Sequence, residues 1–333
     1  MKFFNIMKNM KRIFTLLVAL ITILCFVSCS SVANTLATSL AGADKKGVPN
    51  KPKKSGTNMM LPLVGETDTE LMEDFFPTAL KLYEILHTQN PTHQGLATMT
   101  GSLYVMYANA FVQAKADMMS FDYSLMEEEG RQIQRAKMHY LRGRDYCLNA
   151  FEMRYPGFIK LMMSKDENNF KKALAQLDVK DVNNAYWAGA GWLGAFSVDP
   201  LDIEILPTIS GGVALLERAA ELDPNYNNGA IWEVLTAFYA AAPYDFGGDK
   251  DRAQVCFDKA MEISKGKTIS VYLLKATAYA IPTQDVKMFD ECIEKAMSIN
   301  PDDNPNTRLA TTISRRKAEY LKAHREDLFI IWE

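Results

Sequence analysis

The sequence predicts an all-α protein made of stacked helical hairpins. From Glu66 onward apolar residues recur at spacings of three and four, as in Leu82, Ile85 and Leu86, which is typical of amphipathic helices. No convincing run alternates with the period of two that a half-buried strand requires. In addition, a short pattern around Ala219 returns further along the C-terminal half. These observations together indicate helical repeats.

The repeated pattern combines small and apolar residues at fixed spacing. The matched sets are Gly212, Leu216, Ala219 and Pro224; Ala253, Phe257 and Ala260; and Phe289, Ile293, Ala296 and Pro301. They resemble the second-helix signature of the tetratricopeptide repeat, in which a small residue lets the paired helix approach. The first-helix signature is mostly absent, so the repeats are degenerate. Because such hairpins bury their apolar faces only by stacking, we expect a solenoid with a central apolar pore or groove.

Several helices have recognisable ends. A long amphipathic segment is predicted from Glu127 to Met153, with three glutamates in its first turn, where the helix dipole favours them. A shorter helix is predicted from Asn183 to Phe196. Pro77 is expected in the first turn of a helix, where its missing N–H is tolerated. His93, near a helix break, is expected to be a surface group.

Overall charge excludes one class of function. The 333 residues carry 37 Lys plus Arg and 40 Asp plus Glu, for a net charge of −3. This balance excludes a polybasic nucleic-acid binder. The hydrophobic content of 48% is sufficient for a core.

Residues 1–28 are predicted to be a lipoprotein signal peptide. Basic residues precede an apolar run from Ile13 to Val27, which is too short for a comfortable transmembrane helix. The following Phe26-Val27-Ser28-Cys29 resembles a bacterial lipobox, with Phe departing from the usual Leu. The resemblance implies cleavage before Cys29 and acylation of its thiol and new amino terminus, with palmitate-type chains. The alternative is an uncleaved anchor in which Cys29 is an ordinary thiol.

Three segments therefore follow from the sequence: the signal peptide, a flexible basic tether over 29–60, and a helical domain over 61–333. The tether contains five lysines with Gly, Pro, Ser and Asn and little apolar periodicity. The lipoprotein interpretation predicts a periplasmic protein that meets the membrane through its lipid anchor only. Ser30 and Ser31 lack the Asp that retains some lipoproteins at the inner membrane, so outer-membrane anchoring is favoured.

Motifs of catalysis and metal binding are incomplete. The stretch Gly189–Gly194 matches G-x-G-x-x-G, but no strand precedes it, so close helix packing explains it better. Asp223, Asn225 and Asn227 have calcium-loop spacing, but Asn228 replaces the required Gly, which favours a turn between repeats. We expect no enzyme activity, no metal and no cofactor.

Three cysteines remain in the body: Cys147, Cys256 and Cys292. Their odd number and the lack of a C-x-x-C pair imply neither a disulfide framework nor a zinc site. Cys256 and Cys292 occupy the same repeat position in successive repeats, and both are expected to be reduced core residues.

Aromatic residues on the predicted helices are the candidates for binding. Most are expected in the core, but repeat position assigns some to the concave face, ending in basic residues. The candidate pore-lining residues are Tyr186, Trp187, Trp192, Ile231, Leu235, Phe238, Tyr239, Tyr272, Tyr279, Arg308 and Arg315. Such a lining suits an amphipathic ligand with an acidic head, or the apolar surface of a partner.

Four stretches together resemble one family, the TRAP-transporter T components. The stretches are Arg154 to Phe158; Asp181 to Trp187 with Trp192; Gly247 to Ala253 with Phe257, Ala260 and Ser264; and Asn304 to Leu321 with Asp327 to Phe329. The resemblance implies an all-helical body with an apolar pore and a homotrimer. It also implies a partner, the periplasmic solute-binding P component of a TRAP-type importer, and a hydrophobic or amphipathic small-molecule ligand.

An adaptor function is the alternative. A tetratricopeptide-like protein could bind peptides or an envelope assembly factor and have no small-molecule ligand. A closed apolar channel would favour the transporter component, and an open groove lined by polar residues would favour the adaptor.

Overall fold

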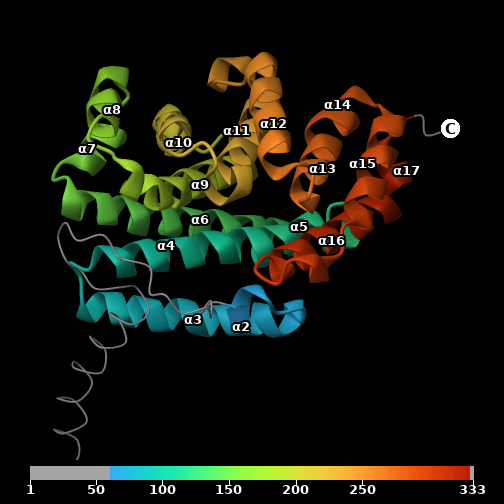
Figure 1. Ribbon diagram of the computed structural model, residues 1–333, viewed down its shortest axis with the longest axis horizontal. Coiled ribbons are helices and arrows are strands. Elements are labelled where there is room, and N and C mark those ends of the chain that lie inside the picture. The colour runs from blue at the N-terminus through green and yellow to red at the C-terminus, as the bar shows by residue number, and fades with distance from the viewer. Residues whose placement is uncertain (1–60, 331–333) are drawn as a thin grey trace, which may run out of the picture.

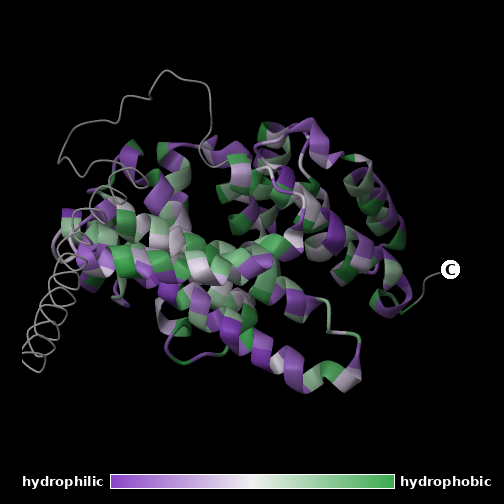
Figure 2. Cartoon of the chain, turned by 90° about the horizontal axis from the view of Figure 1, so that it is seen from below, coloured by the Kyte–Doolittle hydropathy of each residue, from purple (hydrophilic) through white to green (hydrophobic). Residues whose placement is uncertain are grey.

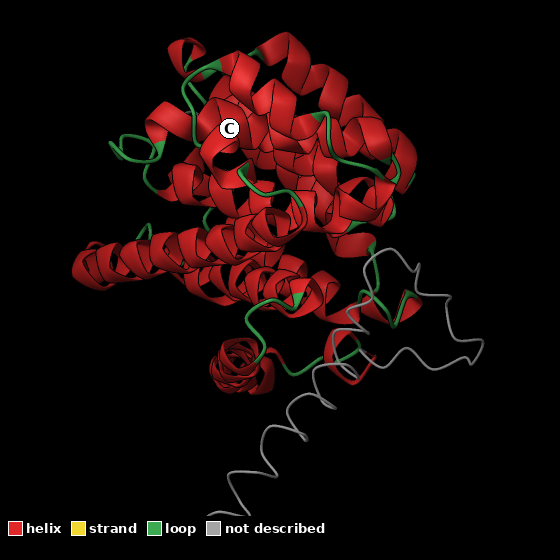
Figure 3. Cartoon of the chain, turned by 90° about the vertical axis from the view of Figure 1, so that its left-hand side faces the viewer, coloured by secondary structure: helices red, strands yellow, loops and turns green. Residues whose placement is uncertain are grey.

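Helices make up all the regular structure of residues 61–330, the part of the chain that the computed structural model describes (Figure 3). The all-α prediction is therefore confirmed. The signal peptide, Cys29 and the tether lie outside the described residues and stay predictions.

The elements of the N-terminal half include one of the longest helices of the molecule, α6, and a π-helical segment, η1. In chain order they are α2 (Leu61–Val64), α3 (Thr69–Gln89), α4 (Gln94–Tyr107), η1 (Ala108–Gln113), α5 (Ala114–Asp117), η2 (Tyr123–Leu125), α6 (Met126–Arg154), α7 (Phe158–Met162), α8 (Glu167–Leu174), η3 (Val179–Asp181) and α9 (Val182–Val198).

The C-terminal half contains shorter helices and a second π-helical segment, η7. In chain order the elements are η4 (Leu206–Thr208), α10 (Ile209–Leu222), η5 (Tyr226–Gly229), α11 (Ala230–Ala241), η6 (Tyr244–Phe246), α12 (Lys250–Ser264), α13 (Ile269–Lys275), η7 (Ala276–Ala280), α14 (Ile281–Thr283), α15 (Val286–Ser298), η8 (Pro301–Asp303), α16 (Arg308–Ala323) and α17 (Arg325–Leu328).

Helix starts follow the local sequence through side-chain caps. Asp68 Oδ1 accepts hydrogen bonds from the backbone N–H groups of Glu70 and Leu71 and so begins α3. Asp249 caps α12 in the same way. These caps satisfy N–H groups that have no partner inside the helix.

Two expectations at helix starts are wrong. Pro77 lies inside α3, because the Asp68 cap begins the helix well before it. The Pro77 side chain is exposed, so its ring does not displace core residues. His93 is 9% exposed, and its Nδ1 accepts a hydrogen bond from the N–H of Leu96 at 3.2 Å. It is therefore the buried N-cap of α4 and not a surface group.

The repeated pattern of the C-terminal half does mark packed helices. Its central alanines, Ala219, Ala260 and Ala296, lie in α10, α12 and α15 and are fully buried. A Cβ on Gly212 would lie 2.9 Å from Cγ of Trp192, so glycine is what allows α10 to approach α9 there. The prediction of stacked helical hairpins is confirmed.

The helices are stacked in chain order. Helix α6 packs between α4 and α9, α9 packs on α10, and α11 packs on α12. In Figure 1, α3, α4, α6 and α9 rise from bottom to top, and α11 to α16 then continue toward the C-terminus. Helices of both halves show hydrophilic and hydrophobic residues side by side (Figure 2), as amphipathic helices do when one face is buried.

The core consists of two clusters of buried side chains. The first extends from α3 to α12, and the second joins α13, η7, α15, α16 and Phe329. Leu309 and Ile313 of α16 pack against the first cluster although α16 contributes buried residues to the second. Helix α16 therefore connects the two clusters.

The end of the chain returns to its beginning through α16. Lys317 Nζ lies 2.9 Å from Asp117 Oδ2 of α5, and Arg308 Nη1 donates to the carbonyl oxygen of Gly65 at 3.3 Å. The ring of Phe121 stacks on the His324 ring, with centroids 5.0 Å apart. These contacts close the helical stack on itself.

Candidate functional site

A closed circuit of packed helices defines the interior of the molecule. Helix α3 contacts α4, α4 contacts α9, α9 contacts α11, α11 contacts α13, α13 contacts α16, and α16 contacts α3. We call α4 with η1, α9, α11, α13 with η7, and α16 the inner helices. Whether a pore runs through this circuit stays a prediction.

Five segments of the inner helices are nearly free of charge, whereas α13 carries Lys275 and α16 carries several charged residues. Among the segments α4, η1, α9, α11 and η7, Glu233 is the one residue that is Asp, Glu, Lys or Arg. A carboxylate in such surroundings loses hydration that apolar neighbours do not replace. Its presence in an apolar layer therefore makes Glu233 a candidate for function.

Glu233 projects from α11 toward α13. Its Oε1 accepts a hydrogen bond from Ser270 Oγ at 3.0 Å, and Glu233 forms no ion pair with the described residues. Burial raises the pKa of its carboxyl to about 7, and the Ser270 bond only partly opposes this shift. The side chain is nevertheless only partly buried. It is thus a carboxyl that changes charge near neutral pH and is not sealed in the core.

A group of three aromatic rings lies close enough to Glu233 for its charge to act on Tyr186. The Tyr186 ring lies 4.9 Å from the Trp187 ring and 5.2 Å from the Tyr226 ring. Burial raises the pKa of the Tyr186 hydroxyl, and the charge of Glu233 adds to that shift. All three rings are partly exposed. They offer apolar surface, and the hydroxyl groups of the two tyrosines stay neutral at physiological pH.

The π-helical segment η1 supplies further neutral polar groups. Asn109 Nδ2 donates to the Tyr140 hydroxyl at 3.2 Å, and that hydroxyl donates to Gln113 Oε1 at 2.5 Å. The Tyr140 ring lies against Gly194, where a Cβ would come within 2.5 Å of it. Segments of π-helix occur frequently at functional sites, and here one turns two amides toward α6.

Five predicted lining residues lie in the packed core. Trp192, Ile231, Leu235, Phe238 and Tyr239 are between 0% and 6% exposed. Trp192 Nε1 donates to Thr208 Oγ1 at 3.2 Å, and the Tyr239 hydroxyl donates to Glu217 Oε1 at 2.8 Å. In this structure these side chains serve packing between α9, α10, α11 and α12.

The other predicted lining residues are partly buried and lie apart from one another. Tyr186 and Trp187 belong to the aromatic group beside Glu233. The Tyr279 ring packs edge-on against Phe257 of α12, and Lys295 Nζ lies 5.9 Å from the centre of the Tyr272 ring. Contact of Tyr272 and Tyr279 with a ligand stays a prediction.

The predicted basic end of the groove is engaged within the chain. Arg308 Nε lies 3.0 Å from Asp302 Oδ1, in addition to its contact with the backbone of Gly65. Arg315 Nη1 donates to the carbonyl oxygen of Ile299 at 3.2 Å, and its Nε lies 3.4 Å from Glu319 Oε1. Both guanidinium groups therefore help to hold α16 in place.

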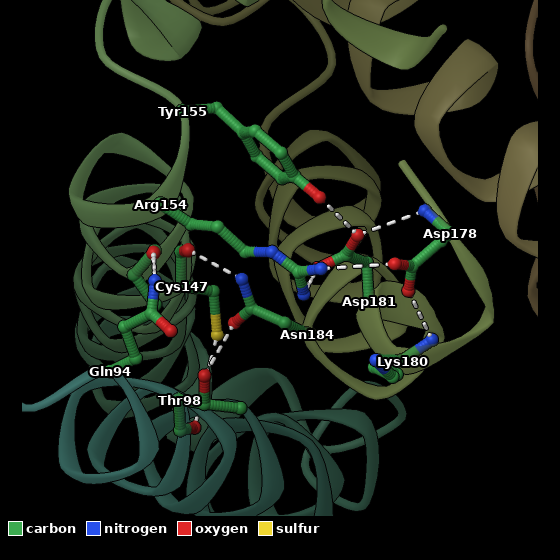
Figure 4. A network of polar contacts seen from close by, with 10 residues as sticks. Gln94, Thr98, Cys147, Arg154, Tyr155, Asp178, Lys180, Asp181 and Asn184 are labelled. Atoms are coloured by element: carbon green, nitrogen blue, oxygen red, sulfur yellow. Dashed lines mark hydrogen bonds and ion pairs between the residues drawn. The ribbon is translucent and has the colours of Figure 1, made fainter. Parts of the chain in front are cut away.

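A polar network holds α9 against α6 (Figure 4). Arg154 Nη1 lies 2.8 Å from Asp181 Oδ1, its Nη2 lies 3.0 Å from Asp178 Oδ2, and the Tyr155 hydroxyl donates to Asp181 Oδ2 at 2.8 Å. Asn184 Nδ2 donates to the carbonyl oxygen of Cys147 at 2.9 Å. Two of the stretches that resemble the T components thus meet here, and their role is to position α9.

Metal and thiol chemistry find no support in the described part of the chain. Within residues 61–330 no group of three or more His, Cys, Asp or Glu side chains is arranged to hold a metal ion. Cys256 and Cys292 are free and buried, as predicted, and Cys147 is free and buried as well. No helix of this same range is both long and apolar enough for a membrane span.

Glu233 belongs to no motif of two or more catalytic groups in the sequence and was not among the predicted site residues. One signal could have identified it. The helix AIWEVLTAFYAA contains a single charged residue among apolar ones, and a lone acid in a predicted buried helix is costly enough to require a partner or a function.

Comparisons with known proteins agree with the resemblance in the sequence. The family model described as TRAP transporter T-component matches residues 65–329. An "Uncharacterized protein" of Treponema pallidum (strain Nichols) is 39% identical over 265 residues, which are 80% of this chain and 81% of that relative. The family match includes all the inner helices and both core clusters.

Proposed function

The chain belongs to the TRAP transporter T-component family, and from this premise we propose that it works as the lipid-anchored periplasmic partner of a solute-binding P component. In this proposal it binds or conducts a hydrophobic or amphipathic small molecule through the interior enclosed by the inner helices. It is a transport component and not an enzyme.

The observation that carries the proposal is the closed circuit, in which α4, η1, α9, α11 and η7 have Glu233 as their one charged residue. In a regular ring of six helices with axes roughly 8–10 Å apart, the centre lies about as far from each axis, whereas a helix with side chains has a radius of roughly 5–6 Å. A space of roughly 3–4 Å in radius then remains for small side chains or an alkyl chain. Neutral aromatic walls suit an apolar ligand.

The same closure disfavours the adaptor alternative. A peptide-binding solenoid offers an open concave surface, whereas α16 here packs on α3 and is joined to α5 through Lys317 and Asp117. Recovery of a peptide or an assembly factor in place of a solute-binding protein would still favour that alternative.

The partner is tested by capture from the cell envelope. The tagged full chain is purified under mild conditions, and associated proteins and small molecules are identified by mass spectrometry. A periplasmic solute-binding protein and a retained apolar molecule are the expected results. Absence of any solute-binding protein under several mild conditions would contradict the partnership.

The anchor is tested at Cys29, within the predicted signal and lipobox. Mass spectrometry of the membrane-purified protein should show a triacylated amino-terminal cysteine, and Cys29→Ser should release the protein from the membrane. An unmodified Met1 terminus would contradict lipid anchoring. Fractionation of the two membranes would then test the proposed outer-membrane location.

The homotrimer is also part of this proposal, and α3 is the face to test. Leu71, Phe75, Leu82 and Ile85 on α3 are 41% to 60% exposed, at spacings of four, seven and three that match a coiled-coil seam. Leu82→Asp with Ile85→Asp should therefore convert the trimer to monomers in light-scattering measurements.

The matched control for this test changes other exposed apolar residues. Leu201 and Ile203, in the loop between α9 and α10, are 72% and 86% exposed, and Leu201→Asp with Ile203→Asp should leave the trimer intact. A trimer that survives the α3 substitutions would exclude this face.

A further inference from the structure

Five segments of the inner helices offer one acidic side chain and no basic one. Glu233 is the one charged residue of α4, η1, α9, α11 and η7. Within α13, Lys275 lies at the last turn, and its Nζ is 5.9 Å from the centre of the Phe257 ring on α12. The charge that α4, η1, α9, α11 and η7 present is therefore negative.

Three of the five basic residues of α16 are paired within the chain, and the other two, Arg316 and Lys322, are exposed. Arg308 is paired with Asp302, Arg315 with Glu319, and Lys317 with Asp117. A ligand carboxylate would have to displace these contacts to find a positive partner, and in the interior it would meet Glu233. The acidic ligand head that the sequence suggested is therefore poorly matched.

Resting on the function proposed above, we propose that Glu233 and Ser270 form a polar subsite that selects amphiphiles whose polar group donates a hydrogen bond, such as an alcohol or a primary ammonium group. In this subsite Ser270 Oγ donates a hydrogen bond to Glu233 Oε1 at 3.0 Å. The other carboxylate oxygen, Oε2, forms no hydrogen bond or ion pair with the described residues. The second oxygen is thus available to accept from the ligand, and the partly exposed ring of Tyr186, on which the charge of Glu233 acts, is the nearest aromatic candidate for its apolar part.

Ligand preference follows from the chemistry of a carboxylate. An ionised Glu233 attracts an ammonium group, accepts from a hydroxyl group and repels a carboxylate. Hydrogen bonds to charged groups contribute about 1.5–3 kcal/mol, which corresponds to about tenfold to a hundredfold in affinity. A subsite that consisted of neutral hydroxyl groups alone would not bind ammonium, hydroxyl and carboxylate ligands with affinities in this order.

The test uses three ligands with the same alkyl chain. Binding of decylamine, decan-1-ol and decanoate to the full mature chain carrying Cys29→Ser is measured by calorimetry at pH 8.5. The wild-type interior should bind decylamine most tightly and decanoate most weakly. Glu233→Gln should weaken decylamine binding by about tenfold to a hundredfold and change decan-1-ol binding less, because the amide oxygen still accepts a hydrogen bond.

Two further variants complete the test. Ser270→Ala removes the internal partner of Glu233 but keeps the carboxylate, so it should retain the preference for decylamine. Glu262→Gln, at an exposed position of α12, should leave all three affinities unchanged. Circular dichroism establishes that each variant is folded.

The subsite is overturned if the wild type binds decanoate as tightly as decylamine, or if Glu233→Gln leaves the ratio of the two affinities unchanged. Failure of this kind is distinguishable from failure of the proposed function. Capture of a solute-binding partner without the ligand order would overturn the subsite alone, whereas the ligand order without a partner would contradict the transport function and support the subsite.

Discussion

Replacing Glu233 by Gln is expected to stabilise the folded protein at alkaline pH and to have no such effect below pH 5. The carboxyl is held in an apolar layer with Ser270 as its hydrogen-bonding partner. Burial raises its pKa from 4.5 to about 7. The folded chain therefore prefers the neutral form of this side chain, whereas the unfolded chain has no such preference.

The size of the effect follows from proton linkage. Below pH 4.5 Glu233 is protonated in both states, so it has no influence on stability. Between pH 4.5 and 7 the unfolded chain releases the proton and the folded chain retains it, so the free energy of unfolding falls as the pH rises. At about 1.4 kcal/mol for each unit of pKa, the loss reaches about 3 kcal/mol above pH 7. Gln cannot ionise, and its amide oxygen can accept from Ser270, so Glu233→Gln should lack this loss.

Urea unfolding followed by circular dichroism at pH 5, 6, 7, 8 and 9 measures the difference. The variant and the wild type should have similar stability at pH 5 and should diverge as the pH rises. Glu262→Gln, on the exposed side of α12, is the matched control and should follow the wild type throughout. A constant difference between Glu233→Gln and the wild type across this range would refute the reasoning.

Three further predictions concern the packing around the site. Burial, followed by nearby Arg and Lys charges, lowers the pKa of His139 to about 4. As the pH falls below 6.5, the unfolded chain therefore binds a proton at His139 before the folded chain does, and the free energy of unfolding decreases. His139→Phe should remove up to about 2 kcal/mol of this acid destabilisation, allowing for solvent screening at a partly exposed ring, as measured by urea unfolding at pH 4.5 and 7. Asp181→Ala leaves the guanidinium group of Arg154 without its buried partner and should lower the free energy of unfolding by about 3 kcal/mol. Gly194→Ala places a methyl group against the Tyr140 ring and should lower the free energy of unfolding by about 1–3 kcal/mol. An unchanged urea midpoint would contradict the ion pair in the case of Asp181→Ala, and the close packing on Tyr140 in the case of Gly194→Ala.

The sequence predicts the helices well because their causes are local. The segment predicted from Glu127 to Met153 is the helix Met126–Arg154, and the one predicted from Asn183 to Phe196 is Val182–Val198. Apolar spacing and end signals determine these elements within a few neighbouring residues. Pro77 misled the prediction because the start of α3 is set by the Asp68 cap, nine positions earlier.

The interior was harder to predict because it depends on which face of each helix turns inward. In α11 the large apolar residues Ile231, Leu235 and Phe238 share a face, and this face is buried in the core. Glu233 projects from another face, toward Ser270 of α13. Periodicity shows that α11 has two faces, but only the packing of neighbouring helices decides which of them faces the interior.

Closure of the helical circuit by α16 bears on both the fold and the candidate site. Leu309 and Ile313 of α16 pack against the first core cluster, so α16 covers apolar side chains that would otherwise be exposed. The contacts of Lys317 with Asp117 and of Arg308 with Gly65 hold α16 in this position. Among α4, η1, α9, α11 and η7, selectivity for a polar group can come only from Glu233 or from neutral hydroxyl and amide groups. Under the function proposed above, substitutions at Glu233 should alter which ligands bind, whereas substitutions at Lys317 should weaken the closure by α16.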